Sequence, residues 1–243
     1  MIKIYVPIIA LFLYLSAVNA QEACSVQDKL CLMQELERTA AEIENKSWRD
    51  KTYRELAKSY TYEGYSDKAI TLIGKIETPD TRAMTIRGIG MAAADQNMPK
   101  EQYDALFSNL AKEADKIEHK PSKAIAYTYI AMSQAFAKDD EGAIATARSM
   151  ENDALRHKAF AETAEIQAQR GDAKAAFFSI DEIESSSFKN KALSTVAKIF
   201  ANDDNLESAY SAANKITNTY NRAQILQYIL NKGNPEEDMS ASN

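Results

Sequence analysis

The chain has 243 residues, of which 39 are alanine but only 7 are glycine and 5 are proline. β-Sandwiches, barrels and glycine-looped nucleotide-binding folds need more turn residues, so this composition predicts a mostly helical protein. The net charge of -6 and the pI near 5.2 disfavour a nucleic-acid partner, because binding to phosphates needs a basic face.

The first twenty residues are typical of a secretory signal peptide. Lys3 precedes an apolar run from Ile4 to Leu15, and small residues follow as far as Ala20. The run is shorter than the roughly 20 apolar residues that span a bilayer, which disfavours a membrane anchor. Cleavage after Ala20 would leave 28 basic and 35 acidic residues and predicts a periplasmic or secreted protein with no stable membrane insertion. A lipoprotein is the alternative, but it needs a small-residue box directly before Cys24, where Gln21-Glu22-Ala23 stands.

Cys24 and Cys31 are a closely spaced pair, which in an oxidising compartment favours a disulfide over two free thiols. Seven residues of continuous helix would separate their Cα atoms by about 10 Å, beyond the roughly 7 Å that a disulfide allows. One cysteine must therefore lie outside the helix, and Ser25 as N-cap would leave Cys24 on the incoming chain. We expect a structural bridge worth about 2 kcal/mol, since a redox pair usually has the spacing Cys-x-x-Cys.

Two flanking helices are predicted. Residues 21–47 contain an amphipathic helix between Ser25 and Asn45 that covers the first repeat, with an apolar stripe of Leu30, Met33, Leu36 and Ala40. At the other end, Ala223 to Leu230 predicts a capping helix. Residues 233–243 have no large apolar residue except Met239, and they predict a disordered tail.

A period of 33 residues organises the chain after Trp48. At this offset alanine fills four columns and a fifth is apolar, whereas chance predicts about half of one all-alanine column. The columns are Ala126/Ala159/Ala192, Ala131/Ala164/Ala197, Ala135/Ala168/Ala201, Ala143/Ala176/Ala209 and Met150/Ile183/Ile216. The frame extends upstream to Ala57 and makes five units. The second unit, anchored on Gly88, carries ten extra residues around Asp95 to Tyr103.

Each unit is predicted to be two helices joined by a tight turn. In the fourth unit the helical spacing runs from Ala159 to Gln167, Gly171 interrupts it, and it resumes at Ala176. Such a turn needs one residue with a positive φ. The residue at this position is Gly64, Lys138, Gly171 or Asp204, depending on the unit. A single hairpin cannot bury its own apolar face, so the units must stack into a solenoid with a continuous core.

The repeat resembles the tetratricopeptide repeat, whose motif of Trp, Leu-Gly, Tyr, Ala, Phe, Ala and Pro is spread over two antiparallel helices. The first unit is similar to it at Leu56-Ala57, Tyr60, Ala69, Ile73 and Ile76. The resemblance covers roughly residues 48 to 222 and departs from the family in its 33-residue period and in the absence of the closing Pro from the late units. It implies an all-α, right-handed α-solenoid of about five helix-turn-helix repeats within residues 48–232, with an N-terminal helix and a C-terminal capping helix.

The resemblance also implies that the first helices line a concave face where the family's partners bind as peptides. The residues expected on this groove are Arg54, Lys58, Tyr62, Ile89, Met132, Phe136, Glu165, Gln169, Lys198 and Asn202. Its basic and aromatic start favours an acidic or carboxylate-bearing peptide, and Met132 with Phe136 would accept an apolar side chain. Core packing is the alternative for these two. Lys58 replaces the Asn of the family's carboxylate clamp, so that activity is not expected here.

Catalytic and metal-binding patterns are missing from the sequence, which contains no Gly-x-Ser-x-Gly elbow, phosphate-binding glycine loop or His-Glu-x-x-His pair. His119 and His157 each stand beside a lysine and are interpreted as solvated residues at helix ends. The clusters Asp139-Asp140-Glu141 and Asp203-Asp204 fall at the repeat turns and are interpreted as N-caps and solvated turns. We therefore predict no catalytic residue, no metal and no cofactor.

Tyr60, Tyr127 and Tyr129 are expected in the repeat core, with their hydroxyl groups at its rim. Taken together, these features favour an exported helical-repeat scaffold or adaptor that binds a protein or peptide partner and is not an enzyme. Two alternatives stay open. The chain could be a helical domain of an envelope-associated enzyme or an enzyme accessory, or it could bind a small molecule or an envelope polymer through the apolar patch.

Overall fold

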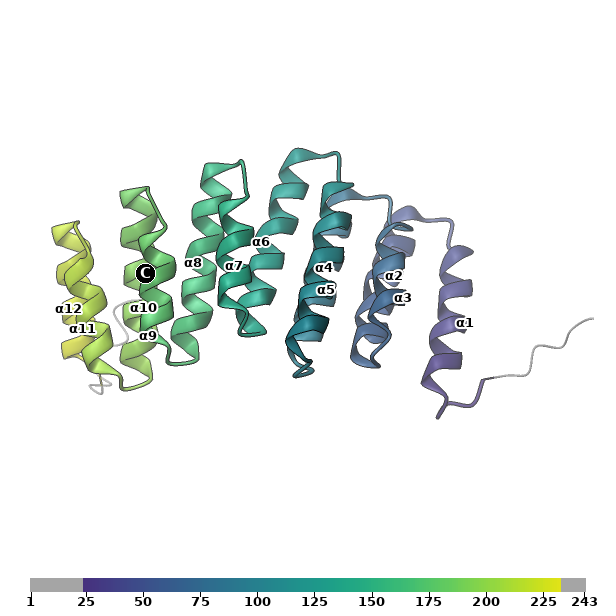
Figure 1. Cartoon of the computed structure of the whole chain (residues 1–243), viewed down its shortest axis with the longest axis horizontal. Coiled ribbons are helices and arrows are strands. Elements are labelled where there is room, and N and C mark those ends of the chain that lie inside the picture. The colour runs from purple at the N-terminus through teal and green to yellow at the C-terminus, as the bar shows by residue number, and fades with distance from the viewer. Residues whose placement is uncertain (1–23, 233–243) are drawn as a thin grey trace, which may run out of the picture.

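The computed structural model describes residues 24–232, so the predicted signal peptide and the predicted tail lie outside the described residues. Within this range the chain is helical and contains no strand, which confirms the predicted all-α solenoid. The helices stand side by side in a bowed row that runs from α1 to α12 (Figure 1). They are α1 Lys29–Ala41, α2 Lys46–Tyr62, α3 Ser66–Ile73, α4 Pro79–Ala94, α5 Lys100–Asp115, α6 Lys120–Phe136, α7 Asp140–Arg148, α8 Asp153–Gln169, α9 Ala173–Asp181, α10 Ser186–Asn202, α11 Leu206–Lys215 and α12 Thr219–Leu230.

The N-terminal disulfide is present between Cys24 and Cys31, whose Cα atoms are 5.6 Å apart. Cys31 lies in the first turn of α1 and Cys24 precedes the helix, as the spacing argument requires. The cap differs from the prediction, because Asp28 and not Ser25 is the N-cap and accepts a hydrogen bond from the Cys31 backbone N–H. A turn closed by the Asp28 N–H and the Ser25 carbonyl brings the chain back over the helix start.

The first helices of the units are α2, α4, α6, α8, α10 and α12. Each begins 33 residues after the one before it, except α6, which begins 41 residues after α4. The second unit is thus longer by eight residues and not ten, mainly because α5 has 16 residues where the other second helices have 8 to 10. Gly90, not Gly88, is the equivalent of Ala57. The predicted capping helix is the first helix of a sixth unit and begins at Thr219, ahead of Ala223.

Small residues occupy the column where successive first helices approach one another. A Cβ on Gly90 would lie 2.5 Å from the Ser133 Oγ of α6, so the column leaves no room for a larger side chain there. Leu230 is the last member of the column and is 83% exposed, because no later first helix within residues 24–232 covers it. The other members have no exposed surface: Ala57, Ala131, Ala164 and Ala197.

The turn between the two helices of a unit contains one residue in the left-handed conformation. Where this residue is not glycine, its Cβ atom strains the backbone. The closing hydrogen bond runs from the Tyr65 N–H to the Tyr60 carbonyl at 2.8 Å in the first unit, and the third, fourth and fifth units repeat it. The predicted turn residues are confirmed, with φ values of +82 for Gly64, +82 for Gly171, +64 for Lys138 and +59 for Asp204.

The fourth residue of every first helix is basic, a column that the sequence argument missed, and in α2, α4, α6, α8 and α10 this residue contacts the end of the preceding unit or helix. Arg49, Arg82 and Arg156 each donate a hydrogen bond to a backbone carbonyl six residues earlier, over 3.1, 2.5 and 3.0 Å. These carbonyls end the preceding unit, where the partial negative charge of a helix C-terminus favours a cation. The remaining members of the column are Lys123, Lys189 and Arg222.

The first helices form one layer and the second helices form the other. Each first helix contacts the next first helix and its own second helix, whereas successive second helices make few contacts with one another. The first helices therefore build the continuous layer of the stack. We call the exposed side of this layer the first-helix face; it is the surface on which the predicted groove residues were placed.

Candidate functional site

The first-helix face is formed mainly by the sixth, ninth or tenth, thirteenth and seventeenth residues of each first helix, which helical periodicity puts on one stripe. The thirteenth residue of one helix lies against the tenth residue of the next. Lys58 Cγ comes within 2.9 Å of the place where a Cβ on Gly88 would stand. Lys198 Nζ lies 5.3 Å from the ring centre of Tyr228. This contact rule relates neighbouring units along the face.

Nine of the ten predicted groove residues occupy these positions. Ile89 does not, and its assignment was wrong, because it is fully buried and equivalent to the core residue Leu56. The error followed from anchoring the second unit on Gly88, and Met91, which is half-buried, holds the intended position. The exposed members are Tyr62, Phe136, Gln169, Lys198 and Asn202, and the half-buried members are Arg54, Lys58, Met132 and Glu165.

The basic residues at the N-terminal end of the face are already paired within the chain. Arg54 and Lys58 approach the Glu55 carboxylate to 2.8 and 3.3 Å. Burial alone would raise the pKa of Glu55, but the hydrogen bonds and positive charges of Arg54 and Lys58 lower it. These two cations are therefore partly neutralised, which weakens the argument that this end selects an acidic peptide.

Apolar side chains gather in the middle of the face, on α4 and α6, and we call them the apolar patch. Phe136 is 40% exposed. Met132 is shared between surface and core, because it also packs against Ala135, Ala143 and Ile166, so the core interpretation holds for part of its side chain. At one edge the Arg87 guanidinium lies 5.5 Å from the ring centre of Tyr129. The patch consists of Met84, Met91, Ile125, Tyr129, Met132 and Phe136.

Two carboxylates of α8 border this patch, and we call Glu162 and Glu165 the acid pair. By the contact rule, Met132 on α6 adjoins Glu162 on α8. Glu165 is half-buried and makes no hydrogen bond or ion pair with the described residues. Burial, and then the negative charge of Glu162, raise the pKa of Glu165, and Lys191 opposes them. Glu162 Oε1 lies 3.5 Å from Lys158 Nζ, while its buried Oε2 has no hydrogen-bond partner in the described chain.

The histidines are placed differently from each other. His119 is the exposed residue that precedes α6, and its Nδ1 lies 2.6 Å from Ser122 Oγ. His157 is not solvated as predicted, since it is only 7% exposed within α8, and its ring centre is 5.6 Å from that of Phe188. Across residues 24–232, no group of three or more His, Cys, Asp or Glu is arranged to hold a metal ion.

The acidic clusters lie at the repeat turns, as predicted, where their carboxylates accept hydrogen bonds from the backbone or pair with arginine. Asp139 is the N-cap of α7 and accepts a hydrogen bond from the Gly142 N–H at 3.0 Å. Asp140 pairs with Arg170, whose guanidinium also donates to the Ala135 carbonyl in the last turn of α6. These carboxylates therefore support the turns between units.

Two of the predicted core tyrosines donate hydrogen bonds from their hydroxyl groups to carboxylates. Tyr60 is fully buried and donates to Glu37 at 3.1 Å, and half-buried Tyr127 donates to Asp115 at 3.0 Å. Burial, followed by these hydrogen bonds, raises the pKa of each hydroxyl to about 12. Both tyrosines fit the expected position at the rim of the core.

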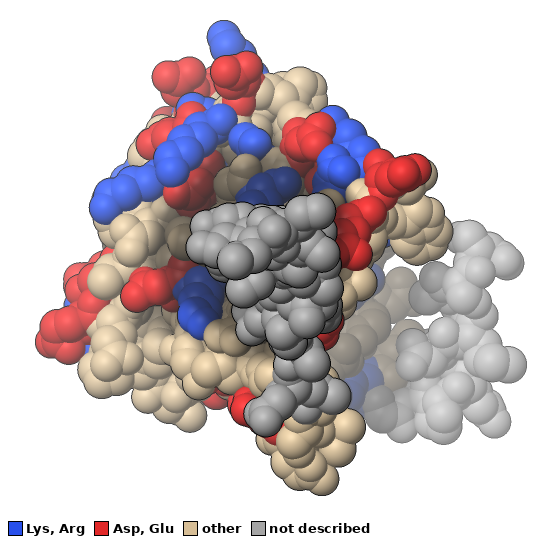
Figure 2. Space-filling model, turned by 90° about the vertical axis from the view of Figure 1, so that its right-hand side faces the viewer, with Lys and Arg blue, Asp and Glu red and all other residues tan. Residues whose placement is uncertain are grey.

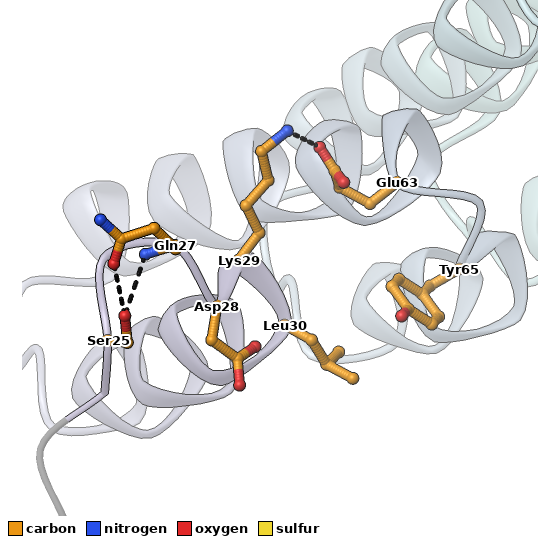
Figure 3. Close-up of a pocket in the computed structure, with 7 residues that line it drawn as sticks. All are labelled: Ser25, Gln27, Asp28, Lys29, Leu30, Glu63 and Tyr65. Atoms are coloured by element: carbon orange, nitrogen blue, oxygen red, sulfur yellow. Dashed lines mark hydrogen bonds and ion pairs between the residues drawn. The ribbon is translucent and has the colours of Figure 1, made fainter.

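A pocket of about 660 Å³ lies away from the first-helix face, at the N-terminal end of the stack. Figure 3 shows Lys29 of α1 reaching across it to form an ion pair with Glu63, next to Tyr65 in the α2–α3 turn. Its lining is mostly polar, and Figure 2 shows Lys and Arg interspersed with Asp and Glu over this end, not gathered into a patch of one sign. The pocket therefore lacks the apolar lining and converging charges of a ligand site.

No family model, curated protein or solved structure matches this chain. None of the described helices combines the length and the apolar character needed to cross a membrane.

Proposed function

We propose that the protein is an exported scaffold or adaptor that binds a protein or peptide segment across its first-helix face. The observation that carries this proposal is the apolar patch, which interrupts a face that is otherwise mostly polar. Phe136 is the exposed member of this patch, and Met84, Met91, Ile125, Tyr129 and Met132 are half-buried around it. Apolar side chains that cluster at the surface on one face of a repeat protein are typical of a docking surface. The Cys24–Cys31 disulfide supports an oxidising compartment, either periplasmic or extracellular.

A flexible peptide segment suits this surface better than a small molecule does. Small-molecule sites are concave and enclose most of their ligand. The patch is instead an extended surface over two neighbouring first helices, and methionine side chains adapt to irregular partners. The proposal assigns the protein no catalytic role.

The test is a selection of displayed octapeptides on the exported protein with its disulfide formed. Peptides that bind should lose affinity about tenfold or more when Phe136 is changed to Ser, because the substitution removes a large apolar contact from the patch. The matched control is Phe178→Ser, which removes a phenylalanine that is 55% exposed on second helix α9. Equal losses in both variants, or no selected peptide at all, would contradict the proposal.

A further inference from the structure

The acid pair carries negative charge that is only partly compensated within the described chain. Glu55 on the same face has Arg54 and Lys58 as ion-pair partners, whereas Glu165 has none within residues 24–232. The buried Oε2 of Glu162 also lacks a hydrogen-bond donor. A partly buried carboxylate without a donor is unfavourable, so a cation that reaches Glu165 from a ligand would compensate its charge.

The basic residues around the acid pair do not neutralise both carboxylates, which leaves negative charge for such a cation to compensate. Glu162 and Glu165 are three residues apart on α8, so their charges repel each other across one helical turn. Lys158, on the same helix, reaches only Glu162 Oε1. Lys191 on α10 acts on Glu165 through its field but is not within ion-pair distance. A positive group placed between the two carboxylates would relieve their repulsion.

The apolar patch and the acid pair lie side by side and together define the chemistry of a ligand. The contact rule seen between α2 and α4 and between α10 and α12 puts Met132 of α6 against Glu162 of α8, with Phe136 one turn further along α6. Packed helices are about 8–10 Å apart, so α4, α6 and α8 together span roughly 16–20 Å. An extended peptide covers this length with about six residues.

We propose that the segment bound here carries a lysine or arginine side chain close to a bulky apolar side chain, with the cation on Glu162 and Glu165 and the apolar group on Met132 and Phe136. This inference rests on the proposed function and names the chemistry of the partner. It reverses the sequence-based expectation of an acidic peptide.

The experiment is a double-mutant cycle on an octapeptide selected with the exported protein. The basic residue of the peptide is replaced by norleucine, and Glu165 of the protein is changed to Gln. We expect each single change to weaken binding about tenfold, and the two together to weaken it little further, because both remove the same charge-assisted contact. Glu118→Gln, an exposed carboxylate between α5 and α6, is the matched control and should leave the affinity unchanged.

The outcomes separate this inference from the proposed function. Coupling between the peptide cation and Glu165 supports both. Selected peptides that are acidic or uncharged, or changes that add independently, would overturn the inference, while a loss of their binding in Phe136→Ser would still support docking on the face. If no peptide is selected, the proposed function is contradicted and the inference falls with it. Circular dichroism of each variant confirms that the helices are intact.

Discussion

Gly90 of α4 faces Ser133 of α6 so closely that a Cβ at residue 90 would lie 2.5 Å from Ser133 Oγ and 2.7 Å from its Cβ. These two residues mark the tight contact between successive first helices, which the other units make with alanine. The contact ties the solenoid together at the unit whose length departs from the repeat. It therefore provides the most direct test of the stacking.

Gly90→Ala should destabilise the protein by up to about 2 kcal/mol, because overpacking of the helix contact, about 1–3 kcal/mol, outweighs the preference of the helix for alanine, about 1 kcal/mol. Gly88→Ala is the control, since its methyl group would meet only the flexible Lys58 side chain, and alanine favours the helix by about 1 kcal/mol. Thermal unfolding followed by circular dichroism should show a lower midpoint for the first variant and an equal or higher midpoint for the second. A lower midpoint for Gly88→Ala alone would contradict the corrected register.

The turn residue Lys138 should be replaceable by glycine with a gain in stability. Its positive φ of 64 costs a residue with a Cβ atom about 1 kcal/mol, which glycine does not incur. The reciprocal change, Gly171→Lys, should lower stability by a similar amount at the equivalent turn. Urea unfolding of the two variants measures both effects. Equal stability of all three proteins would show that the turns are not strained.

Arg156→Met should destabilise the junction between the third and fourth units by about 1.5–3 kcal/mol. Methionine keeps much of the apolar stem but removes the donor to the Met150 carbonyl, and hydrogen bonds from charged groups are worth this amount. It also removes a surface ion pair with Asp153, which is matched by the ion pair that the control below removes. Arg148→Met breaks only a surface ion pair with Glu182 and should cost less than about 1 kcal/mol. Chemical unfolding of the two variants measures both losses in the free energy of unfolding. A larger loss in Arg148→Met would refute the role of the basic column.

The free energy of unfolding should fall between pH 10 and 12. Tyrosine ionises near pH 10 in an unfolded chain, whereas the pKa of Tyr60 and of Tyr127 is about 12 in the folded protein. The unfolded state therefore loses these protons first, so the stabilisation is complete below about pH 10 and is lost as the pH rises to 12. Urea unfolding at several alkaline pH values measures this decline. The double variant Tyr60→Phe/Tyr127→Phe should show a shallower decline, and an identical slope would contradict the assignment.

His157 is the fifth residue of α8. At this position of α2 and α10, a side chain forms a hydrogen bond with the connection that leads to the next unit. Asp50 accepts a hydrogen bond from the Thr78 N–H at 2.8 Å, and Asn190 accepts one from the Thr217 N–H at 2.9 Å. His157 has a buried Nε2 without a partner in the described chain. His157→Asn should therefore be more stable than His157→Ala by about 1 kcal/mol, because the amide regains a bond to the following connection. Equal melting midpoints of the two variants would show that residue 157 forms no hydrogen bond with the following connection.

Much of the candidate site could be located from sequence because its residues repeat at fixed positions. Phe136, Glu165 and Lys198 stand on the first-helix face as the 33-residue frame places them. Ile89 was misplaced because Gly88 and Gly90 are both small and either can anchor the column. The choice between them depends on which glycine meets Ser133, a residue 43 positions further along the chain from Gly90.

The amino-acid sequence is sufficient to predict the helical class, the period and the left-handed turns, and it favours the disulfide. Each of these follows from the periodicity of apolar residues or from the backbone preferences of a few neighbouring residues, which are local properties. The packed helices were needed to show that Glu165 has no ion-pair partner in the described chain, that Lys191 of α10 opposes the rise in its pKa, and that His157 is buried. Burial and charge pairing depend on what neighbouring helices bring to the same place, and a pattern along a single chain does not record those distances.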